Sequence, residues 1–398
     1  MTPLRVLLYT PVVPTEAGGV QAVYRRTAAF LAARGHAVVR AWPIDDPAAP
    51  EPRPRRWPSP GEVLTLRLPR LEDRRLPLGR PRPTPRGLLH AADPLRRLRS
   101  TLRGFRPRVV DVHFPRGGTR WFASSRRRAA LVLTCHGSDL LQPLPADAAR
   151  LRALLRRADR IIAVSAGLAE RAETLRAGGH RPAFPRAPVE VIPNGVDLAF
   201  WRRPDDAAAA PAALACVGRL ERVKGHDVLL RALARLRASV PAARLTLVGD
   251  GPEAPALRSL AAELGLGDAV RFAGRLDPAA TAALLHASSV AVMPSRSEGL
   301  PLALLEAMAA GLPPVVTRVG GMPDALGEPP AGRIVAPEDP AALAASLAAL
   351  LADPAARAAL AAAAVRRAAA FSAAAADLRH AEVLEEAALS RPGRSPAR

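Results

Sequence analysis

A short basic motif is the feature of this sequence best suited to chemistry. The motif, GRLERVKG at 218–225, follows an apolar run that ends at Val217, so we expect it at the carboxyl end of a strand. Lys224 is the only lysine in the chain, which otherwise uses arginine at every basic position. That choice indicates a site where a compact ammonium fits and a planar guanidinium does not. Arg219 and Lys224 together suit a diphosphate; the alternative is a solvated loop with an incidental lysine.

A second motif, PSRSEGLPLALLEAM, carries two carboxylates around an expected helix start. Pro301 is typical of a first helical residue, so the amides of Gly299 and Leu300 would form a helix N-terminus that receives an anion. Glu298 would precede this helix and Glu306 would lie inside it, and both could accept hydrogen bonds from vicinal hydroxyls. A nucleotide sugar has this layout, with a sugar at each end of a diphosphate. The alternative is one surface glutamate and one buried structural glutamate.

The first half of the chain offers two smaller candidate sites. Gly18 and Gly19 follow the first expected strand and open an amphipathic helix, and adjacent glycines let the backbone approach a ligand closely. His136 and Asp139 lie in the segment TCHGSD, which also follows an expected strand. His136 could hydrogen-bond a transferred sugar, and Asp139 could orient that sugar or contact the acceptor. The alternatives are a tight turn for the glycines and a satisfied structural role for the histidine.

The elements that must position these residues alternate between strand and helix in both halves of the chain. This alternation predicts an α/β fold with doubly wound parallel sheets, whose ligands bind at the carboxyl ends of the strands. The predicted strands are Val6–Thr10, Val38–Trp42, Val63–Leu68, Val109–His113, Leu131–Cys135, Ile161–Val164, Val189–Ile192, Leu214–Val217, Leu245–Val248, Val270–Ala273, Val290–Met293 and Val315–Thr317.

At 398 residues the chain is too long for a single core, so two large domains are expected. A turn and a polar, Pro- and Ala-rich connector place the hinge within 195–212. We predict an N-terminal domain over 1–198, a second domain over 199–375, and a C-terminal helix and tail over 376–398. The Pro- and Arg-rich segment 43–94 would be a variable surface excursion of the first domain or a partly disordered loop.

The net charge of +21 is concentrated in the first half of the chain. Residues 1–200 hold 35 of the 57 basic residues but only 16 of the 36 acidic ones. The arginines lack interleaved aromatic residues and no helix-turn-helix or zinc motif is present, so nucleic acid is not expected as a partner. An anionic membrane surface or a phosphorylated acceptor is the expectation instead. Leucines on one face of 95–105 suggest an interfacial helix; the alternative is a core-facing helix with a solvated Arg side.

Cysteine use and hydropathy bear on where the protein works. Cys135 and Cys216 each end an apolar run and are far apart in sequence, which is typical of a reduced, cytoplasmic protein. The first apolar run is interrupted by Pro11 and lacks a basic leader, so it is expected to be a strand rather than a signal peptide. We expect a cytoplasmic protein that is soluble or peripheral to a membrane. The sequence contains no HExxH, CxxC, P-loop or GxSxG motif, which leaves zinc hydrolysis, thiol redox chemistry, ATPase action and lipase-type chemistry unsupported.

An ordered series of motifs resembles one enzyme family. VGRLERVKG, LTLVGDGPE, FAGRLD and MPSRSEGLPLALLEAMAAGLPPVVTRVGGMPD, preceded by VIPNGVD and, in the first domain, by GGV, are similar to family 4 of the retaining glycosyltransferases, the glycosyl transferases group 1. The resemblance implies the GT-B fold, in which two Rossmann-like domains face each other across a cleft. Asp324 departs from the family, which more often has Glu after the GG pair, and 43–94 has no counterpart.

The resemblance also implies roles for the residues, and it assigns most of them to the donor. A nucleotide-diphosphate sugar would give up its hexose-type sugar to an unknown sugar, lipid or small-molecule acceptor, without a cofactor or a metal ion. The ribose would bind Glu306, and the reacting face of the sugar would lie near His136. The remaining roles are diphosphate binding by Arg219 and Lys224 in place of a metal, phosphate closure by Gly18 and Gly19, sugar binding by Glu298 with the Gly299 and Leu300 amides, and base contacts at Arg275 and Leu276, with Gly218 in the same donor loop.

Two other functions fit the same residues. The first is an epimerase or hydrolase of nucleotide sugars, which the same architecture could support. The second, of another class, is a non-catalytic scaffold that binds anions or membrane surfaces through the basic first half. Such a scaffold would bind anionic vesicles regardless of Lys224 and Glu306, and it would not bind nucleotides.

Overall fold

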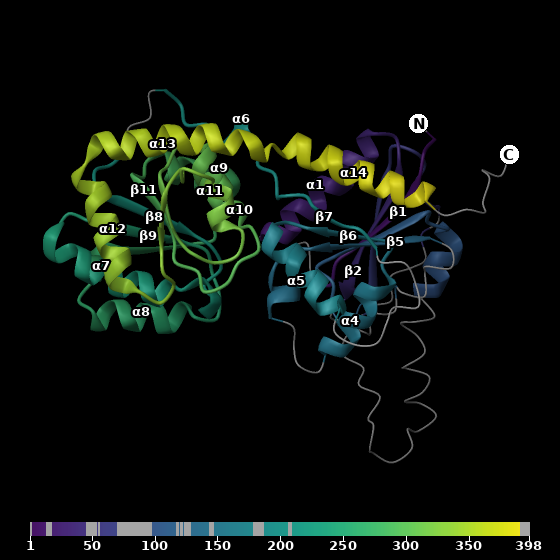
Figure 1. The fold of residues 1–398 in the computed structure, drawn as a ribbon, viewed down its shortest axis with the longest axis horizontal. Helices are drawn as coiled ribbons and strands as arrows, with labels where there is room; N and C mark the ends of the chain where they lie inside the picture. The colour runs from purple at the N-terminus through teal and green to yellow at the C-terminus, as the bar shows by residue number, and fades with distance from the viewer. Residues whose placement is uncertain are drawn as a thin grey trace, which may run out of the picture. The chain divides into compact units, whose positions relative to one another are not determined.

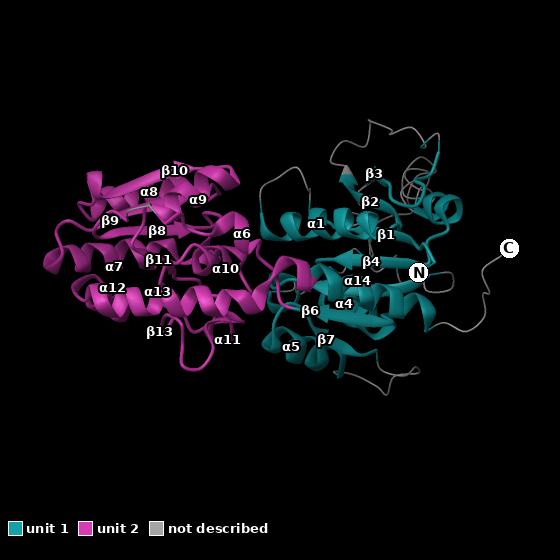
Figure 2. Cartoon of the chain, turned by 90° about the horizontal axis from the view of Figure 1, so that it is seen from above, with its two compact units in different colours: residues 1–192, 377–398 teal, residues 193–376 magenta. Residues whose placement is uncertain are grey.

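The computed structural model divides the chain into two compact units, and each is described by itself (Figure 1, Figure 2). Unit 1 comprises residues 1–192 and 377–398, and unit 2 comprises 193–376. The structure describes residues 2–12, 18–44, 54, 56–69, 98–116, 119, 122, 129–142, 147–177, 187–205 and 209–390.

Unit 1 is built on a seven-stranded parallel sheet. The strand order is β3-β2-β1-β4-β5-β6-β7, so the chain winds outward from β1 in one direction and from β4 in the other. The central strands are mostly apolar and buried on both faces, as a parallel sheet covered by helices requires, and β4 alone of these three carries buried charged or imidazole side chains, Asp111 and His113. The strands are β1 Arg5–Tyr9, β2 Ala37–Ile44, β3 Val63–Pro69, β4 Val109–His113, β5 Ala130–Cys135, β6 Arg160–Ala163 and β7 Val189–Val191.

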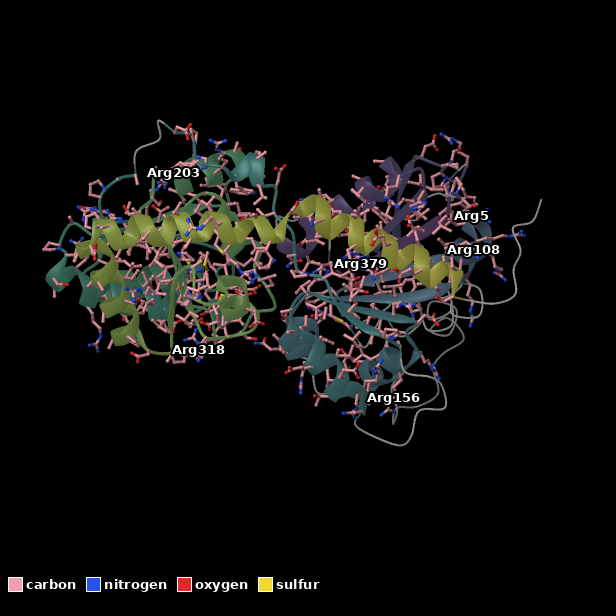
Figure 3. All side chains as sticks on the ribbon, turned by 45° about the horizontal axis from the view of Figure 1, so that its top comes forward. Arg5, Arg108, Arg156, Arg203, Arg318 and Arg379 are labelled. Atoms are coloured by element: carbon pink, nitrogen blue, oxygen red, sulfur yellow. The ribbon has the colours of Figure 1, made fainter. Side chains whose placement is uncertain are left out.

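The helices of unit 1 pack on this sheet, and the last of them comes from the C-terminal end of the chain. The yellow C-terminal helix α14 belongs to unit 1 from Asp377 onward, and Arg108 donates to its Ala388 carbonyl at 3.3 Å (Figure 3). Its Arg379 forms ion pairs with Glu190 on β7, and its Asp377 pairs with Arg26. The helices are α1 Gly19–Ala33, α3 Ser138–Leu141, α4 Ala148–Arg157, α5 Ala166–Ala177 and α14 Ala373–Leu389, with a further helix over 98–105.

Unit 2 contains a second, six-stranded parallel sheet. Its strand order is β10-β9-β8-β11-β12-β13, so here the winding reverses between β8 and β11. Leucines and valines of β8, β9 and β11 form one core with α7, α8 and α12. The strands are β8 Ala213–Val217, β9 Arg244–Val248, β10 Val270–Gly274, β11 Val290–Met293, β12 Pro314–Thr317 and β13 Arg333–Val335.

Capping residues set the starts of several helices in unit 2. Asp277, Asp339 and Asp353 each accept backbone amides at a helix N-terminus, and a proline follows each of them. The helices are α6 Leu198–Trp201, α7 His226–Ser239, α8 Ala254–Glu263, α9 Pro278–His286, α10 Leu302–Ala309, α11 Met322–Leu326, α12 Pro340–Ala352 and α13 Pro354–Ala368, with short 3-10 turns η3 Arg222–Lys224, η4 Gly267–Ala269 and η5 Ala369–Phe371.

The observed sheets confirm the predicted fold class of two Rossmann-like doubly wound domains. Each predicted strand is present, with ends that differ by at most two residues, whereas β13 was not predicted because it has three residues and begins with an arginine. Cys135 and Cys216 are both buried and free. Pro301 corrects one expectation: its extended backbone caps α10, and the helix itself begins at Leu302.

The sequence predicts domain limits at 198 and 375, and the two compact units of the structure are divided at 192 and 376. Residues 193–198 belong to unit 2 because Asn194 donates to the Leu300 carbonyl and Val196 pairs with Ser372. Most of the segment 43–94 and the tail beyond 390 lie outside the described residues.

Two structural features bear on the predicted membrane association, the helix that ends at Phe105 and the length of the apolar helices. Of the predicted interfacial helix at 95–105, the described part buries Leu98 and Phe105, as the core-facing alternative expects. Among the described residues, no single helix has both the length and the apolar composition to cross a bilayer. The neighbouring helical segments Pro340–Ala352 and Pro354–Phe371 meet the length and composition criteria only when they are taken together, and they are bent by 103° relative to each other.

Candidate active site

The two motifs of the second half meet where the strand order of unit 2 reverses. Segment 218–225 follows β8, segment 294–301 follows β11, and β8 pairs directly with β11. Ligands of doubly wound sheets bind in the crevice outside the carboxyl ends of the strands at such a reversal. The sheet topology therefore brings the predicted phosphate-binding residues and the predicted sugar-binding residues to one place.

Close backbone packing holds the two loops together. Gly225 has a left-handed backbone with a φ of 67°, and a Cβ there would collide with the Pro294 carbonyl. The Arg296 amide donates to the Val223 carbonyl at 2.8 Å, and its guanidinium donates to the Arg222 carbonyl at 2.6 Å. The position of Lys224 is thus fixed by contacts on both sides of it.

Lys224 forms an ion pair with Glu298 in this structure. Its Nζ lies 2.6 Å from Glu298 Oε1, and Ser295 Oγ donates to the same oxygen at 2.8 Å. The lysine side chain is 26% exposed and the glutamate 10% exposed, so both remain within reach of a ligand. The pair places an ammonium and a carboxylate side by side, as a ligand with a phosphate next to a sugar hydroxyl would require.

Arg219 precedes this pair on the same loop. Its Nε lies 2.8 Å from Glu221 Oε1, and its side chain is 42% exposed. The turn GDG at 249–251 packs directly against the backbone of this loop. Side chains at Gly249 and Gly251 would collide with the carbonyls of Gly218 and Leu220, so the close contact requires glycine at both positions. The Leu220 backbone amide donates a hydrogen bond to the Asp250 backbone carbonyl at 3.0 Å. These contacts fix the backbone at Arg219, and its guanidinium pairs with Glu221.

The sugar-side motif is supported by the glycine pair at 320–321. A side chain at Gly320, whose φ is 55°, would collide with the Glu298 carbonyl, and Gly321 donates to the Gly299 carbonyl at 2.6 Å. On the other side, Asn194 Nδ2 donates to the Leu300 carbonyl at 2.7 Å. These contacts occupy the carbonyls of Gly299 and Leu300 and leave their amides as the candidate ligand donors.

Glu306 lies within α10, about one turn after the first helical residue, Leu302. Burial raises the pKa of Glu306 to about 7, so the folded protein holds this carboxyl partly protonated near neutral pH. His226, at the start of α7, is also buried, and burial lowers its pKa to about 4, with Lys224 adding to the effect. His226 is therefore neutral at the site, and it leaves the positive charge to Lys224 and Arg219.

The remaining donor-side predictions, Gly218, Arg275 and Leu276, lie in the segments that follow β8 and β10. A Cβ at Gly218 would meet no atom within 4 Å, so the protein itself does not demand glycine there. Arg275 and Leu276 follow β10, which lies two strands away from β8 at the edge of the sheet. Among the described residues, no hydrogen bond or ion pair joins either of them to Lys224 or Glu298. Their contact with a base stays a prediction.

In unit 1, Gly18 and Gly19 stand at the start of α1. Gly18 is the N-cap with a fully extended backbone, and a Cβ there would collide with the Gln21 amide group. The first turn of α1 carries no acidic side chain, so nothing on the helix itself competes for its N-terminal amides. This position suits an anion, and the predicted phosphate contact stays a prediction.

His136 and Asp139 follow β5 and are both buried. Asp139 accepts the backbone amides of His136 and Gly137, at 3.0 and 2.6 Å for the closest oxygens. Burial raises the pKa of Asp139 to about 6 despite these amides. Its carboxylate is thus engaged by the turn, which gives it a local structural role; the predicted acceptor contact stays a prediction.

The sequence motifs did not identify a buried polar cluster beside His136. The rings of His113 and His136 join at 3.1 Å through Nδ1 and Nε2, and Asp111 lies beyond His113. Helix α14 contributes His380, whose Nε2 lies 2.8 Å from Asp111 Oδ2. The only sequence signal was the alternation of polar and apolar residues at the end of β4, where Asp111 and His113 flank a valine. No sequence pattern connects these residues to His380, which lies 269 positions after Asp111. Asp111, His113 and His380 also have the composition of a metal site.

The sequence matches two family models that together span most of the chain. The model "Glycosyltransferase Family 4" matches residues 17–200, and "Glycosyl transferases group 1" matches residues 199–367. A D-inositol 3-phosphate glycosyltransferase from Segniliparus rotundus is 31% identical over 370 residues, covering 85% of this chain and 78% of that protein. Glycogen synthase from Mycobacterium tuberculosis is 39% identical over 207 residues, covering 51% of this chain and 48% of that protein. The chain thus matches about half the length of that synthase.

Solved structures of similar fold cover nearly the whole chain. Sucrose-phosphate synthase from Thermosynechococcus elongatus has a TM-score of 0.78 at 24% identity, covering 98% of this chain and all of the other. Anabaena HepE in complex with UDP has a TM-score of 0.73 at 19% identity, covering 96% of this chain and all of the other. The fold, the inositol-phosphate relative and both family models agree: the chain belongs to glycosyltransferase family 4 and has the GT-B fold.

Proposed function

We propose that the protein is a retaining glycosyltransferase that moves a hexose-type sugar from a nucleotide-diphosphate sugar to a hydroxyl of a sugar, lipid or small molecule, without a metal ion. The observation that carries the proposal is the Lys224–Glu298 pair at the reversal of strand order, 2.6 Å between Nζ and Oε1. A donor needs this juxtaposition because its diphosphate adjoins the hydroxyls of the transferred sugar. HepE, of similar fold, has been solved with UDP and with UDP-glucose.

In this proposal Lys224 and Arg219 neutralise the diphosphate, which is the leaving group. The bond between the anomeric carbon and the phosphate oxygen breaks, and the acceptor oxygen bonds to the same face of that carbon. The acceptor proton passes to the leaving phosphate oxygen, so no enzyme nucleophile is required. Preorganised positive charge stabilises the departing phosphate most strongly in the transition state, and this difference accelerates the reaction.

The other residues would orient the donor. Glu298 and the Gly299 and Leu300 amides would hold hydroxyls of the transferred sugar, and Glu306 would accept the ribose hydroxyls. A donor bound this way would draw Lys224 from Glu298 toward its phosphates. The proposal includes a cytoplasmic location and docking of the basic first half of the chain on anionic membranes.

The test is a transfer assay with UDP-, GDP- and ADP-sugars in the presence of EDTA. Replacing Lys224 by Ala should lower the transfer rate by roughly 10²–10³, as for other positioned charge-stabilising groups. Arg231→Ala is the matched control, since it removes an exposed cation from α7 of the same unit. Full activity of Lys224→Ala would refute the phosphate assignment. Release of free sugar or an epimer without any acceptor would favour a hydrolase or an epimerase.

A further inference from the structure

Three metal-ligating side chains converge in the interior of unit 1. Asp111 and His113 are alternate residues of β4, so their side chains leave the same face of the sheet. Helix α14 adds His380 to them. Asp111 and His113 are completely buried, and His380 is 5% exposed. The ligand atoms of the three residues all lie within 4.8 Å of one another, as the ligands of a single ion do.

Both histidines direct Nε2 at one carboxylate oxygen. Asp111 Oδ2 lies 2.8 Å from His380 Nε2 and 3.0 Å from His113 Nε2. The first contact is a hydrogen bond, whereas His113 Nε2 is buried and has no hydrogen-bond partner among the described residues, although it is close enough. A buried nitrogen without a partner is costly and needs an explanation. A metal ion between the side chains supplies one, because it binds the nitrogen lone pair directly.

The composition of this set fits a divalent transition metal. Two imidazoles and one carboxylate are ligands that zinc takes in proteins, and they leave the fourth position of a tetrahedral ion for a water molecule. Tetrahedral ligand atoms about 2.0–2.1 Å from zinc lie about 3.3 Å from one another. The contacts of 2.8 and 3.0 Å to Asp111 Oδ2 are close to this spacing, so small side-chain rotations would admit the ion.

Neighbouring side chains already hold two of the ligands through their other polar atoms. Thr134 Oγ1 donates to Asp111 Oδ1 at 2.8 Å, which leaves Oδ2 for the ion. His113 Nδ1 lies 3.1 Å from His136 Nε2, which leaves His113 Nε2 for the ion. Outer contacts of this kind orient metal ligands in proteins. Both partners come from β5 or the residue after it, and β5 pairs directly with β4.

We propose that Asp111, His113 and His380 bind one divalent transition-metal ion, for which zinc is the natural probe, and that this ion fastens α14 to β4. The ion joins residues that are 269 positions apart in the chain, so it closes the C-terminal helix onto the sheet of unit 1. Its role is structural. It is separate from the donor diphosphate, whose proposed ligands Arg219 and Lys224 belong to unit 2.

Metal analysis of the full chain tests the proposal. The protein, purified with a tag that contains no histidine, is refolded with zinc and dialysed against EDTA. About one equivalent of zinc per chain should remain, because the buried ligands are closed to the chelator. Refolding with cobalt instead should give the visible absorption of a tetrahedral ion. A natively folded wild type that retains neither metal would overturn the proposal.

Stability and variants test the role and the ligands. The thermal midpoint of the zinc-loaded wild type should exceed that of the zinc-free protein by about 5–10 °C. His113→Gln and His380→Gln should each lose the zinc and this response. His36→Gln is the matched control and should keep its zinc. His36 Nε2 lies 2.9 Å from Glu385 Oε1 on the same helix, but among the described residues no third metal ligand joins that pair.

Two results would overturn the assignment even if zinc is found. The first is zinc that stays in both His113→Gln and His380→Gln, or that is lost equally from His36→Gln, because the ligands would then be other residues. The second is a thermal midpoint that zinc does not change, because the ion would then not fasten α14. Neither result affects the proposed role of Lys224, which the transfer assay tests independently.

Discussion

The polar clusters of the two units differ in how their charges are kept. In unit 2 the side chains of Lys224 and Glu298 are 26% and 10% exposed, whereas in unit 1 those of Asp111 and His113 are completely buried. A partly exposed pair can exchange its partner for a ligand at smaller cost, while a buried charge must be balanced by the protein itself. The first arrangement suits groups that bind substrate, and the second suits groups with a structural role.

The two clusters also differ in what positions them. Gly225 and Gly320 let the backbones of unit 2 touch, so the loops themselves place the charges. In unit 1 the placement comes from side chains on β4, β5 and α14 that contact one another. Substitutions should therefore disturb unit 2 mainly through backbone strain, and unit 1 mainly through altered hydrogen bonds.

The largest effect is expected for Gly225→Ala. An added Cβ would meet the Pro294 carbonyl in a left-handed backbone, so the free energy of unfolding of unit 2 should fall by about 2–4 kcal/mol and transfer should be largely lost. Gly265→Ala is the matched control, because its φ of 65° is similar but no atom lies within 4 Å. Its cost should be about 1 kcal/mol. Equal costs in urea denaturation would show that the loop contact is not what fixes Lys224.

Glu298→Gln should separate sugar binding from phosphate binding. Transfer should fall about 100-fold because a charged acceptor for sugar hydroxyls is lost. The free nucleotide diphosphate should bind several-fold more tightly, because Lys224 no longer has a competing carboxylate at 2.6 Å. Calorimetry with the nucleotide and a transfer assay would measure the two effects. A parallel loss of both activities would place Glu298 outside the sugar subsite.

The raised pKa of Glu306 predicts a pH dependence of donor binding. The ionised carboxylate accepts ribose hydroxyls, so nucleotide affinity should rise about tenfold between pH 6 and pH 8, through the pKa of about 7. Without ligand the sign is opposite for stability: the folded state favours the protonated form, so stability is full at low pH and declines as pH rises toward 7. Glu306→Gln should remove both trends. A wild-type affinity that follows the same pH curve as this variant would contradict the ribose assignment.

The smallest effect is expected at the ion pair that ties α14 to α1. Arg26 Nε lies 2.7 Å from Asp377, with the arginine 28% exposed and the aspartate 6% exposed. Arg26→Ala should reduce the free energy of unfolding by about 1 kcal/mol, because the buried carboxylate loses its partner. Arg56→Ala, which breaks an exposed pair with Glu62, should have no measurable effect. If Arg26→Ala lowered the free energy of unfolding more than Asp111→Ala does, ion pairs rather than the histidine cluster would be what anchors α14.

The convergence of the candidate site residues of unit 2 could be predicted from sequence because they lie in two short segments after neighbouring strands. Lys224 and Glu298 follow β8 and β11, and parallel sheets bring such segments together. Their mutual ion pair was not predicted, since the motifs suggested only ligands for each. The role of the pair Gly320–Gly321 was also missed, although a glycine pair after β12 was visible.

The cluster of unit 1 could not be predicted because one member comes from the far end of the chain. Asp111 and His380 are 269 residues apart, and no local pattern connects a strand to a helix that returns from another unit. His136 was found through its place after a strand, but its ring partners were not. Similarly, the sequence suggested Asp139 as an acceptor-side residue, which stays a prediction, but it did not suggest that the Asp139 carboxylate accepts the backbone amides of the local turn.

Binding calorimetry of UDP, GDP and ADP in EDTA, with the wild type and Lys224→Ala, tests the central claim most directly. At least one diphosphate should bind to the wild type without a metal ion, and Lys224→Ala should weaken that binding by roughly 10²-fold, about 3 kcal/mol. Binding that needs a divalent cation, or that is equally strong in Lys224→Ala, would contradict the account.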